Sequence, residues 1–478
     1  MRKSRSKPTS RLQAGSQPGP RPTAPLAQAG SVPATDAMSQ AGAQAAPATT
    51  PEPVETPAAA EPAATHATPE PVVTHATLGP AATQAPLPSI VDGQSQTFLK
   101  RDLSQVTKAL VLQGGGALGA YQAGVFEALH RDYKVLDWVA GVSIGAINGA
   151  LIAGNAPERR VEALQAFWRQ VSSAPGQLMP RWGGDEQLLA EASAGAAMVF
   201  GIPGMFNPRP TPLWLWGLDA PLAGVYDTAP LRETLLRLVD FDRLNHGGVR
   251  FSVGAVNVRT GNSIYFDNRH QTIGPEHIMA SAALPPGFPA VHIDGEDYWD
   301  GGVVSNTPLQ HVLDQQPREL PLMVLQVDLF SARGPMPTTI GQVIARQKDI
   351  QYSSRTRMNS NVLETQINLG EKLAALLKRL PPELQDDPEV QLLRRHLHRK
   401  PVDIVHLIYR SQRPFAAADF EFSRAAVQSH WQAGVRDMQH TLAHPDLLRV
   451  THAQGVTTYD LADDAHHQVR HRVAAGMV

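Results

Sequence analysis

The chain has 478 residues, with 42 basic and 44 acidic side chains and a formal net charge of −2 at pH 7. This balance gives no electrostatic reason to expect a nucleic acid as a partner, and the complete lack of cysteine excludes disulfides, thiolate metal sites and a cysteine nucleophile. The length allows one large domain or two to three small ones.

The first 95 residues differ in composition from the rest of the chain. Sixteen of the 40 prolines lie within the first 88 residues, and most of the other residues there are Ala, Thr, Gln, Ser and Gly. A segment so poor in large apolar side chains cannot offset the entropy lost on ordering, so residues 1–95 are expected to form a disordered tail. The basic residues at its start are not followed by an apolar stretch, and no run of 18 apolar residues occurs elsewhere. We therefore expect no signal peptide, no transmembrane helix and a cytoplasmic location.

Short apolar runs alternate with helical patterns between residues 106 and 330. Residues 108–113 and 135–140 predict buried strands, and a glycine-rich turn and a helical pattern follow each of them. Later strand patterns cover residues 250–258, 263–266, 291–293 and 322–329, and helical patterns cover residues 120–130, 146–153, 157–171, 228–239, 275–283 and 308–314. Strand–turn–helix units in this order predict an α/β fold whose parallel sheet is covered on both faces.

Residues 335–478 show mainly helical patterns. These cover residues 340–380, a charged stretch that ends near residue 399, and residues 422–440, with one strand-like run at residues 402–409. The histidines near the C-terminus lack the paired spacing on one helix face that a metal site needs, so no metal is expected there. We expect a mostly helical C-terminal extension, which is either a separate domain or a continuation of the preceding region.

Residues 175–225 form a less regular segment that contains many large apolar side chains. They include Met179, Trp182, Met198, Phe200, Met205, Phe206, Trp214 and Trp216. Such side chains can contact lipid tails or a membrane surface, and they also occur in ordinary core packing. Two interpretations stay open: an acyl-chain site or cover in peripheral contact with a membrane, or plain packing.

A serine lies between two glycines directly after the second predicted strand, in the pattern Gly141-Val-Ser143-Ile-Gly145. A serine attacks well only when its hydroxyl is exposed and a base lies beside it. A tight strand-to-helix bend exposes the hydroxyl, and flanking glycines relieve the crowding there. The pattern alone is common by chance, but here a strand precedes it and a small-residue helix follows. Ser143 is therefore the candidate nucleophile, with Gly141 and Gly145 as elbow residues.

The first glycine-rich turn covers residues 114–119 and reads Gly-Gly-Gly-Ala-Leu-Gly. Its backbone N–H groups can converge on one anion beside the helix that follows. The same letters fit a dinucleotide-binding turn, with Asp137 about twenty residues further on, and also a plain tight turn. Because a candidate nucleophile follows in the next unit, we favour an oxyanion hole formed by Gly114, Gly115 and Gly116.

A third motif, Asp300-Gly301-Gly302, follows a short predicted strand. An aspartate at the end of a strand, with two glycines behind it, can stand free and accept the serine proton directly or through water. The same letters also occur in Asp-Gly hairpin turns. No histidine has comparable motif support, so Asp300 is the candidate base.

In this order, the motifs Gly-Gly-Gly-x-x-Gly, Gly-x-Ser-x-Gly and Asp-Gly-Gly resemble those of the patatin-like phospholipase family, over residues 106–330. The resemblance implies a three-layer α/β/α sandwich with a mostly parallel sheet, and a catalytic dyad of Ser143 and Asp300. It also implies an oxyanion loop at residues 114–116 and cleavage of lipid esters with no metal or cofactor. The family often has Arg or Lys where this chain has Leu118, so no cation is implied at that point of the loop.

We therefore expect a serine acyl hydrolase of the phospholipase A or lipid acyl hydrolase type, with a lipid or other acyl ester as its substrate. Two alternatives stay open. One is a lipid-binding or granule-associated protein with the same fold and negligible turnover. The other is a nucleotide-binding module that uses residues 114–119.

Overall fold

The computed structural model describes residues 106–132, 135–173, 186–209, 224–317, 320–354, 356–397, 400, 402–411, 417–444, 456–461 and 468–472. The chain divides into two units, residues 1–85 and 86–478, and all described residues belong to the second. The disordered tail expected over residues 1–95 lies outside the described residues, as do Met179, Trp182, Trp214 and Trp216.

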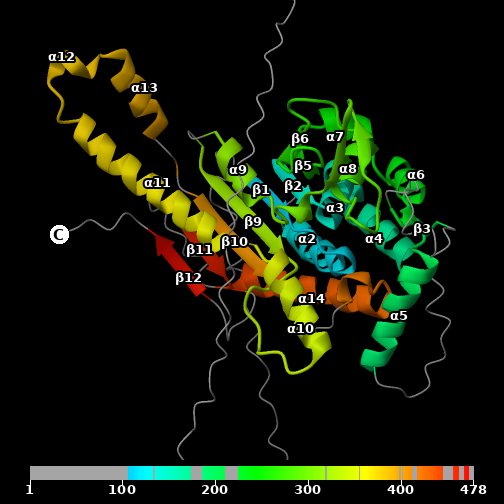
Figure 1. Cartoon of the computed structure of the whole chain (residues 1–478). Coiled ribbons are helices and arrows are strands. Elements are labelled where there is room, and N and C mark those ends of the chain that lie inside the picture. Colours follow the sequence, from blue (N-terminus) through cyan, green and yellow to red (C-terminus); the bar gives the residue numbers. More distant parts are fainter. Residues whose placement is uncertain are drawn as a thin grey trace, which may run out of the picture. The chain divides into compact units, whose positions relative to one another are not determined.

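A ten-stranded sheet forms the centre of the second unit (Figure 1). Its strands are β1 (Thr107–Leu112), β2 (Trp138–Val142), β5 (Arg250–Asn257), β6 (Ser263–Asp267), β7 (Val291–Ile293), β8 (Glu296–Asp300), β9 (Leu322–Asp328), β10 (Val402–Ile408), β11 (Val456–Asp460) and β12 (Gln468–Arg472). They lie in the order β12-β11-β10-β9-β1-β2-β5-β8-β7, and β6 pairs with β5 beside this path. All strands from β11 to β5 along this path run parallel, so the sheet is mostly parallel, as expected. A separate ribbon joins β3 (Asn207–Pro208) to β4 (Tyr226–Asp227).

Helices surround the sheet, and none of the described ones is long and apolar enough to cross a bilayer. The α-helices are α2 (Ala120–Asp132), α3 (Ile144–Ala153), α4 (Arg160–Val171), α5 (Glu186–Phe200), α6 (Ala229–Leu238), α7 (Phe241–His246), α8 (Pro275–Ser281), α9 (Leu309–Gln315), α10 (Ile340–Tyr352), α11 (Thr356–Leu377), α12 (Pro382–Gln385), α13 (Pro388–Leu397) and α14 (Arg424–Ala443). Short 3₁₀ turns are η2 (Gly116–Gly119), η3 (Pro157–Arg159), η6 (Gly301–Val303) and η7 (Ala418–Phe420).

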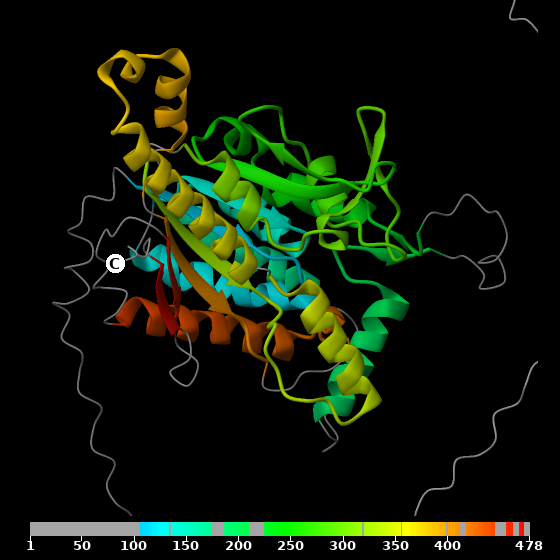
Figure 2. The same ribbon diagram turned by 60° about the vertical axis from the view of Figure 1, so that its left-hand side comes forward.

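Alternate residues of the central strands enter two different hydrophobic clusters. Leu110 and Leu112 of β1 belong to a large cluster shared with α2, α3, α4 and α14. Ala109 and Val111 of the same strand belong to a smaller cluster with Leu309 of α9. Successive side chains of a strand point to opposite faces, so the two clusters lie on opposite faces of the sheet. This is the expected three-layer α/β/α arrangement, and Figure 2 shows α2 and α14 together on one side of the sheet.

Residues beyond 335 contribute strands to this sheet as well as helices. The strand-like run expected at residues 402–409 is β10, which pairs in parallel with β9 along its whole length. β11 then pairs in parallel with β10, and β12 pairs antiparallel with β11. The described part of the C-terminal region therefore continues the central sheet.

Helix α14 packs closely along α2 because each helix has a glycine at the contact. A Cβ on Gly124 would meet the carbonyl oxygen of Trp431, and a Cβ on Gly434 would meet the carbonyl oxygen of Tyr121. The Tyr121 hydroxyl donates to the Asp437 carboxylate at 2.7 Å, and burial raises the pKa of Tyr121 well above its usual value. The last long helix is thus part of the main core.

The substitution Gly434→Ala should lower the free energy of unfolding, because the new methyl group would push α14 away from α2. Overpacking of this kind typically costs ~1–3 kcal/mol. Gly195 in α5 is the matched control, since a Cβ there meets nothing within 4 Å, and Gly195→Ala should be neutral or stabilise by up to ~1 kcal/mol. Urea unfolding followed by circular dichroism compares the two variants, and equal losses would contradict the close packing of the helices.

Candidate active site

Ser143 is the single residue between β2 and α3. The strand ends at Val142 and the helix begins at Ile144, so the serine is the N-cap of α3. Its backbone has φ 55° and ψ −125°, and such a conformation costs a non-glycine residue roughly 1–3 kcal/mol unless its surroundings impose it. A sharp strand-to-helix turn of this kind exposes the side chain at the edge of the sheet.

The two glycines that flank the serine are required by close backbone contacts. A Cβ on Gly141 would collide with the backbone of Gly145, and a Cβ on Gly145 would collide with the carbonyl oxygen of Leu112 at the end of β1. The bend can therefore form only when both positions lack a side chain. Gly141 and Gly145 thus lie on either side of Ser143 at the bend between β2 and α3.

Asp300 reaches the serine through the pairing of three strands. Val142 of β2 pairs with Gly254 of β5, and the next residue of β5, Ala255, pairs with Asp300 of β8. Ser143 directly follows Val142, so the serine and the aspartate lie at the same level of the sheet. Both residues line one pocket, although they are far apart in the chain.

The Asp300 carboxyl is almost fully buried, with 2% of the residue exposed. It accepts a hydrogen bond from the N–H of Gly302 at 2.7 Å. Burial raises the pKa of Asp300 to about 7, and the neighbouring Ser143 side chain and the N–H of Gly302 oppose this rise. The carboxyl can therefore both take up and release a proton near neutral pH.

Ser281, the last residue of α8, holds the elbow in place from the side. The N–H of Ser143 donates to the Ser281 hydroxyl at 2.9 Å, and that hydroxyl donates to the carbonyl of Gly254 at 2.6 Å. One buried hydroxyl thus ties the elbow to the strand that separates it from Asp300. Sequence analysis missed Ser281 because it belongs to no motif and both of its partners are remote in sequence.

The three glycines of the first turn also line this pocket. The N–H of Gly114 donates to the carbonyl of Asn306 at 3.2 Å, so it is engaged, which differs from the expectation that all three glycines serve as free donors. Within the described residues, no hydrogen bond occupies the N–H of Gly115 or Gly116. Gly116 has φ +56°, and a Cβ there would meet the carbonyl oxygen of Asp419. The C-terminal region therefore packs directly against this loop.

The rest of the pocket wall is mainly apolar. The apolar residues include Ile144, Ile147, Leu231, Met279, Phe288 and Phe330. Met205 and Phe206 also line the pocket, whereas Phe200 of the same irregular segment is 65% exposed. Only part of that segment therefore forms the wall. Leu118, where the sequence departs from the family pattern, is buried in the core.

Asp137, which could have served a nucleotide, lies at the other edge of the sheet. Its carboxylate accepts the N–H of Lys108 at 2.8 Å and pairs with the Lys108 ammonium at 3.0 Å. Lys108 is near the start of β1, whereas the glycine loop follows the end of that strand. A strand rises about 3.3 Å per residue, so Asp137 lies too far from the loop to take part in the same site.

Two parts of this chain match the sequence models of known protein families. Residues 110–313 match the sequence model of a family described as patatin-like phospholipase, and residues 350–454 match one described as patatin phospholipase. Lysophospholipase nte1 of Aspergillus terreus is 48% identical over 58 residues, which cover 12% of this chain and 4% of that protein. Lysophospholipase NTE1 of Scheffersomyces stipitis is 21% identical over 249 residues, which cover 52% of this chain and 13% of that protein. The chain thus spans only a small part of these two relatives.

Two solved structures show weaker similarity. VipD from Legionella pneumophila is 13% identical, with a TM-score of 0.29 and coverage of 71% of both chains. Human GIVD cytosolic phospholipase A2 is also 13% identical, with a TM-score of 0.28 and coverage of 49% of this chain and 45% of that chain.

The raised pKa of Asp300 makes the stability of the fold depend on pH. The native pKa of about 7 exceeds the usual value of 3.8, so the native state binds this proton more tightly than the unfolded state. This contribution to stability is fully present below about pH 4 and is lost as the pH rises through about 7. Asp300→Asn cannot ionise, so between about pH 5 and about pH 8 its stability relative to the wild type should rise, by at most ~3 kcal/mol.

Urea unfolding of both proteins at the two pH values measures this change. Asp297→Asn, in the same strand but exposed, controls for the loss of an acidic side chain. A difference between Asp300→Asn and the wild type that stays constant with pH would contradict the raised pKa.

Proposed function

Residues 110–313 of this chain belong to the patatin-like phospholipase family, and on this basis we propose that the protein is a serine acyl hydrolase that cleaves carboxylic esters of lipids. The single observation that carries the proposal is that Ser143, at the strand-to-helix bend, and the buried Asp300 carboxyl line the same largely apolar pocket. A hydroxyl, a neighbouring base and unengaged backbone donors are the parts that acyl transfer requires.

The first half of the proposed reaction forms an acyl-enzyme. The Asp300 carboxylate takes the proton from Ser143 as Oγ attacks the carbonyl carbon of the ester. The resulting oxyanion accepts hydrogen bonds from the N–H groups of Gly115 and Gly116, while Gly114 anchors the loop to Asn306. The carbon–oxygen bond to the alcohol then breaks, and the protonated Asp300 returns its proton to the leaving oxygen.

The second half returns the enzyme to its starting state. A water molecule gives a proton to Asp300 as its oxygen attacks the acyl carbon. The tetrahedral oxyanion again binds to Gly115 and Gly116, the bond to Ser143 Oγ breaks, and Oγ recovers the proton from Asp300. The free carboxylic acid leaves, and no bond change in the cycle needs a metal or a cofactor.

The apolar wall of the pocket supports an acyl chain as the group that it holds. Ile147, Leu231 and Phe288 line it beside the serine, and burial of each methylene of a chain contributes about 0.8 kcal/mol. Val199 and Phe200, at the end of α5, are 63% and 65% exposed. The polypeptide continues from these two residues to Phe206 in the pocket wall. We therefore propose that this end of α5 contacts the lipid surface from which the acyl chain enters.

Removal of Ser143 should abolish turnover, and removal of the Asp300 carboxylate should strongly reduce it, without loss of the fold in either case. Ser143→Ala should reduce hydrolysis of acyl esters to background, and Asp300→Asn should lower kcat by ~10²–10⁴-fold, the usual contribution of a general base. The matched control is Ser263→Ala, because this serine is exposed in β6.

The assay uses nitrophenyl esters of graded chain length and a lysophospholipid. Full activity in either dyad variant would contradict the proposal. Lipid binding by a wild-type protein that shows no turnover would favour the alternative of a lipid-binding protein. A gain in stability against unfolding when a dinucleotide is added would favour the nucleotide-binding alternative.

The dependence of kcat/KM on pH should report the proposed base. Because Asp300 acts as a carboxylate and its pKa is raised to about 7, kcat/KM should fall about tenfold per pH unit below that value and level off above it. Steady-state rates between about pH 5 and about pH 8.5 measure the profile. A flat profile down to about pH 5 would contradict Asp300 as the base.

A further inference from the structure

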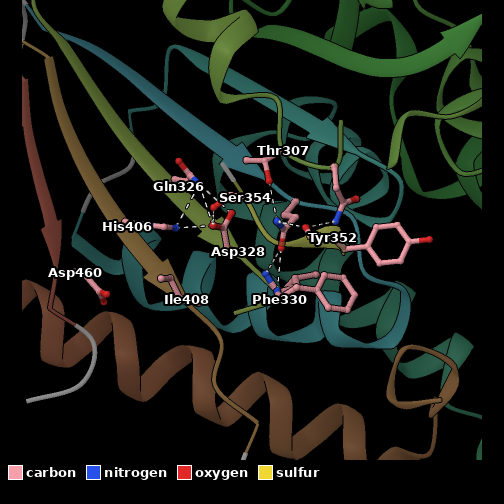
Figure 3. Close-up of polar contacts among 12 residues, drawn as sticks. Thr307, Gln326, Asp328, Phe330, Tyr352, Ser354, His406, Ile408 and Asp460 are labelled. Atoms are coloured by element: carbon pink, nitrogen blue, oxygen red, sulfur yellow. Dashed lines mark hydrogen bonds and ion pairs between the residues drawn. The ribbon is translucent and has the colours of Figure 1, made fainter. Parts of the chain in front are cut away.

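Gln113, the residue immediately before the glycine loop, is fully buried and forms four side-chain hydrogen bonds. Its Oε1 accepts the N–H of Leu329 at 2.6 Å and the N–H of Phe330 at 3.0 Å. Its Nε2 donates to the Thr307 hydroxyl at 2.8 Å and to the Tyr352 carbonyl at 2.9 Å. Figure 3 shows Thr307, Phe330 and Tyr352 arranged around this set of contacts. The Gln113 amide thus connects three segments: the residues after β9, the end of α10 and the segment that follows Asp300.

The backbone of Gln113 is held as firmly as its side chain. Its N–H donates to the carbonyl of Val327 at 3.2 Å, and its carbonyl accepts from Nε2 of Gln122 at 2.7 Å. The Gln122 side chain in turn accepts from Asn148, a buried residue of α3. The start of the glycine loop is therefore connected to the helix that begins at the elbow.

The residues that bind the Gln113 side chain also contact the glycine loop, either directly or through Asn306, and thereby hold the loop in place. Asn306 Nδ2 donates to the Gly114 carbonyl at 3.0 Å and to the Tyr352 carbonyl at 3.1 Å, so Tyr352 serves both Gln113 and Asn306. A Cβ on Gly115 would lie 2.7 Å from Leu329 Cδ1. A shift of Leu329 or Tyr352 would therefore be transmitted to the loop.

A second polar cluster joins the end of β9 to the residues that follow α10 and to β10. The Asp328 carboxylate, at the end of β9, accepts a hydrogen bond from the Ser354 hydroxyl and lies 2.5 Å from Nε2 of His406 on β10. Figure 3 shows Asp328, Ser354 and His406 around this cluster. Residues 350–354 and β10 belong to the C-terminal region, so that region supports the loop.

The chemistry of the site selects glutamine at this position. Two backbone N–H groups need an acceptor, while a hydroxyl and a carbonyl oxygen need donors. A primary amide offers both kinds of group, whereas a carboxylate has no donor and a thioether has only a weak acceptor. Loss of the amide would leave the N–H groups of Leu329 and Phe330 buried without a partner, which destabilises the fold.

We propose that Gln113 is a positioning residue that holds the N–H groups of Gly115 and Gly116 where the oxyanion forms, and that it couples the C-terminal region to catalysis through Tyr352. This inference rests on the proposed hydrolase function. Gln113 touches no substrate, and its effect on the reaction passes through the loop.

The test compares Gln113→Met with Gln316→Met. Gln316 is also buried, and its Nε2 donates to Thr107 at 2.9 Å, at the opposite end of β1 from the loop. Four quantities are measured for each variant and the wild type: kcat and KM for a nitrophenyl ester, the Ki of a trifluoromethyl ketone with the same acyl chain, and the Kd of the matching non-hydrolysable ether. The ketone is attacked by the serine and forms an oxyanion, whereas the ether forms none.

Gln113→Met should lower kcat by ~10–100-fold, because misplacement of a catalytic group by about 1 Å can cost ~10²-fold. The Ki of the ketone should rise by the same factor, and the Kd of the ether should stay within twofold of the wild type, on the order of measurement error. Gln316→Met should lose stability and keep all four values. An unchanged kcat, or a lower kcat with an unchanged Ki for the ketone, would overturn the positioning role.

A milder variant keeps the test decisive if Gln113→Met does not fold. Thr307→Val removes one acceptor of Gln113 and keeps nearly the same volume, so kcat and the affinity for the ketone should fall together by several fold. If kcat and the affinity for the ketone do not fall together in Thr307→Val, the inference is overturned. A wild-type protein that hydrolyses no ester marks a failure of the proposed function itself, and the positioning role then falls with it.

Discussion

The parallel pairing of β1 with β2 on one side and with β9 on the other is the constraint on which the site depends. Parallel strands end at the same edge of a sheet, so the loops that follow Leu112, Val142 and Asp328 emerge side by side. The glycine loop, the serine elbow and two partners of Gln113, Leu329 and Phe330, occupy these three loops. Burial of β1 on both faces, by the two hydrophobic clusters, keeps this register fixed. A one-residue slip of β1 would bury the wrong side chains and separate the loop from the serine.

Two features of the site oppose the stability of the fold. Ser143 adopts a positive φ that a non-glycine residue rarely takes, and Asp300 is buried where its charged form is disfavoured. Surrounding contacts hold both in place: the Ser281 hydroxyl binds the elbow, and the N–H of Gly302 binds the carboxylate. A buried carboxylate is a stronger base than an exposed one, so the arrangement that weakens the fold also equips Asp300 to take a proton near neutral pH.

Local patterns in the sequence predict much of this site, because a few adjacent residues define a glycine–serine–glycine bend, a bare loop and an aspartate at a strand end. The parallel sheet and the positions of Ser143 and Asp300 beside one pocket follow from such patterns. The roles of Ser281 and Gln113 do not, since the partners of Gln113 include Phe330, 217 residues away. The strands β11 and β12 were also missed, because they are short and polar and their pairing depends on a neighbour formed elsewhere in the chain. Features that depend on contacts between remote segments, such as the roles of Ser281 and Gln113, could therefore not be predicted from local sequence patterns.

We propose that the Ser143 hydroxyl is the nucleophile that attacks the ester in the pocket. The decisive measurement is reaction with an acyl-chain phosphonate, followed by proteolysis and mass spectrometry of the peptides. We expect one adduct, on the peptide that contains Ser143, with formation slowed in Asp300→Asn and blocked by an excess of ester substrate. An adduct on another residue, or stoichiometric labelling of Ser143→Ala, would contradict it.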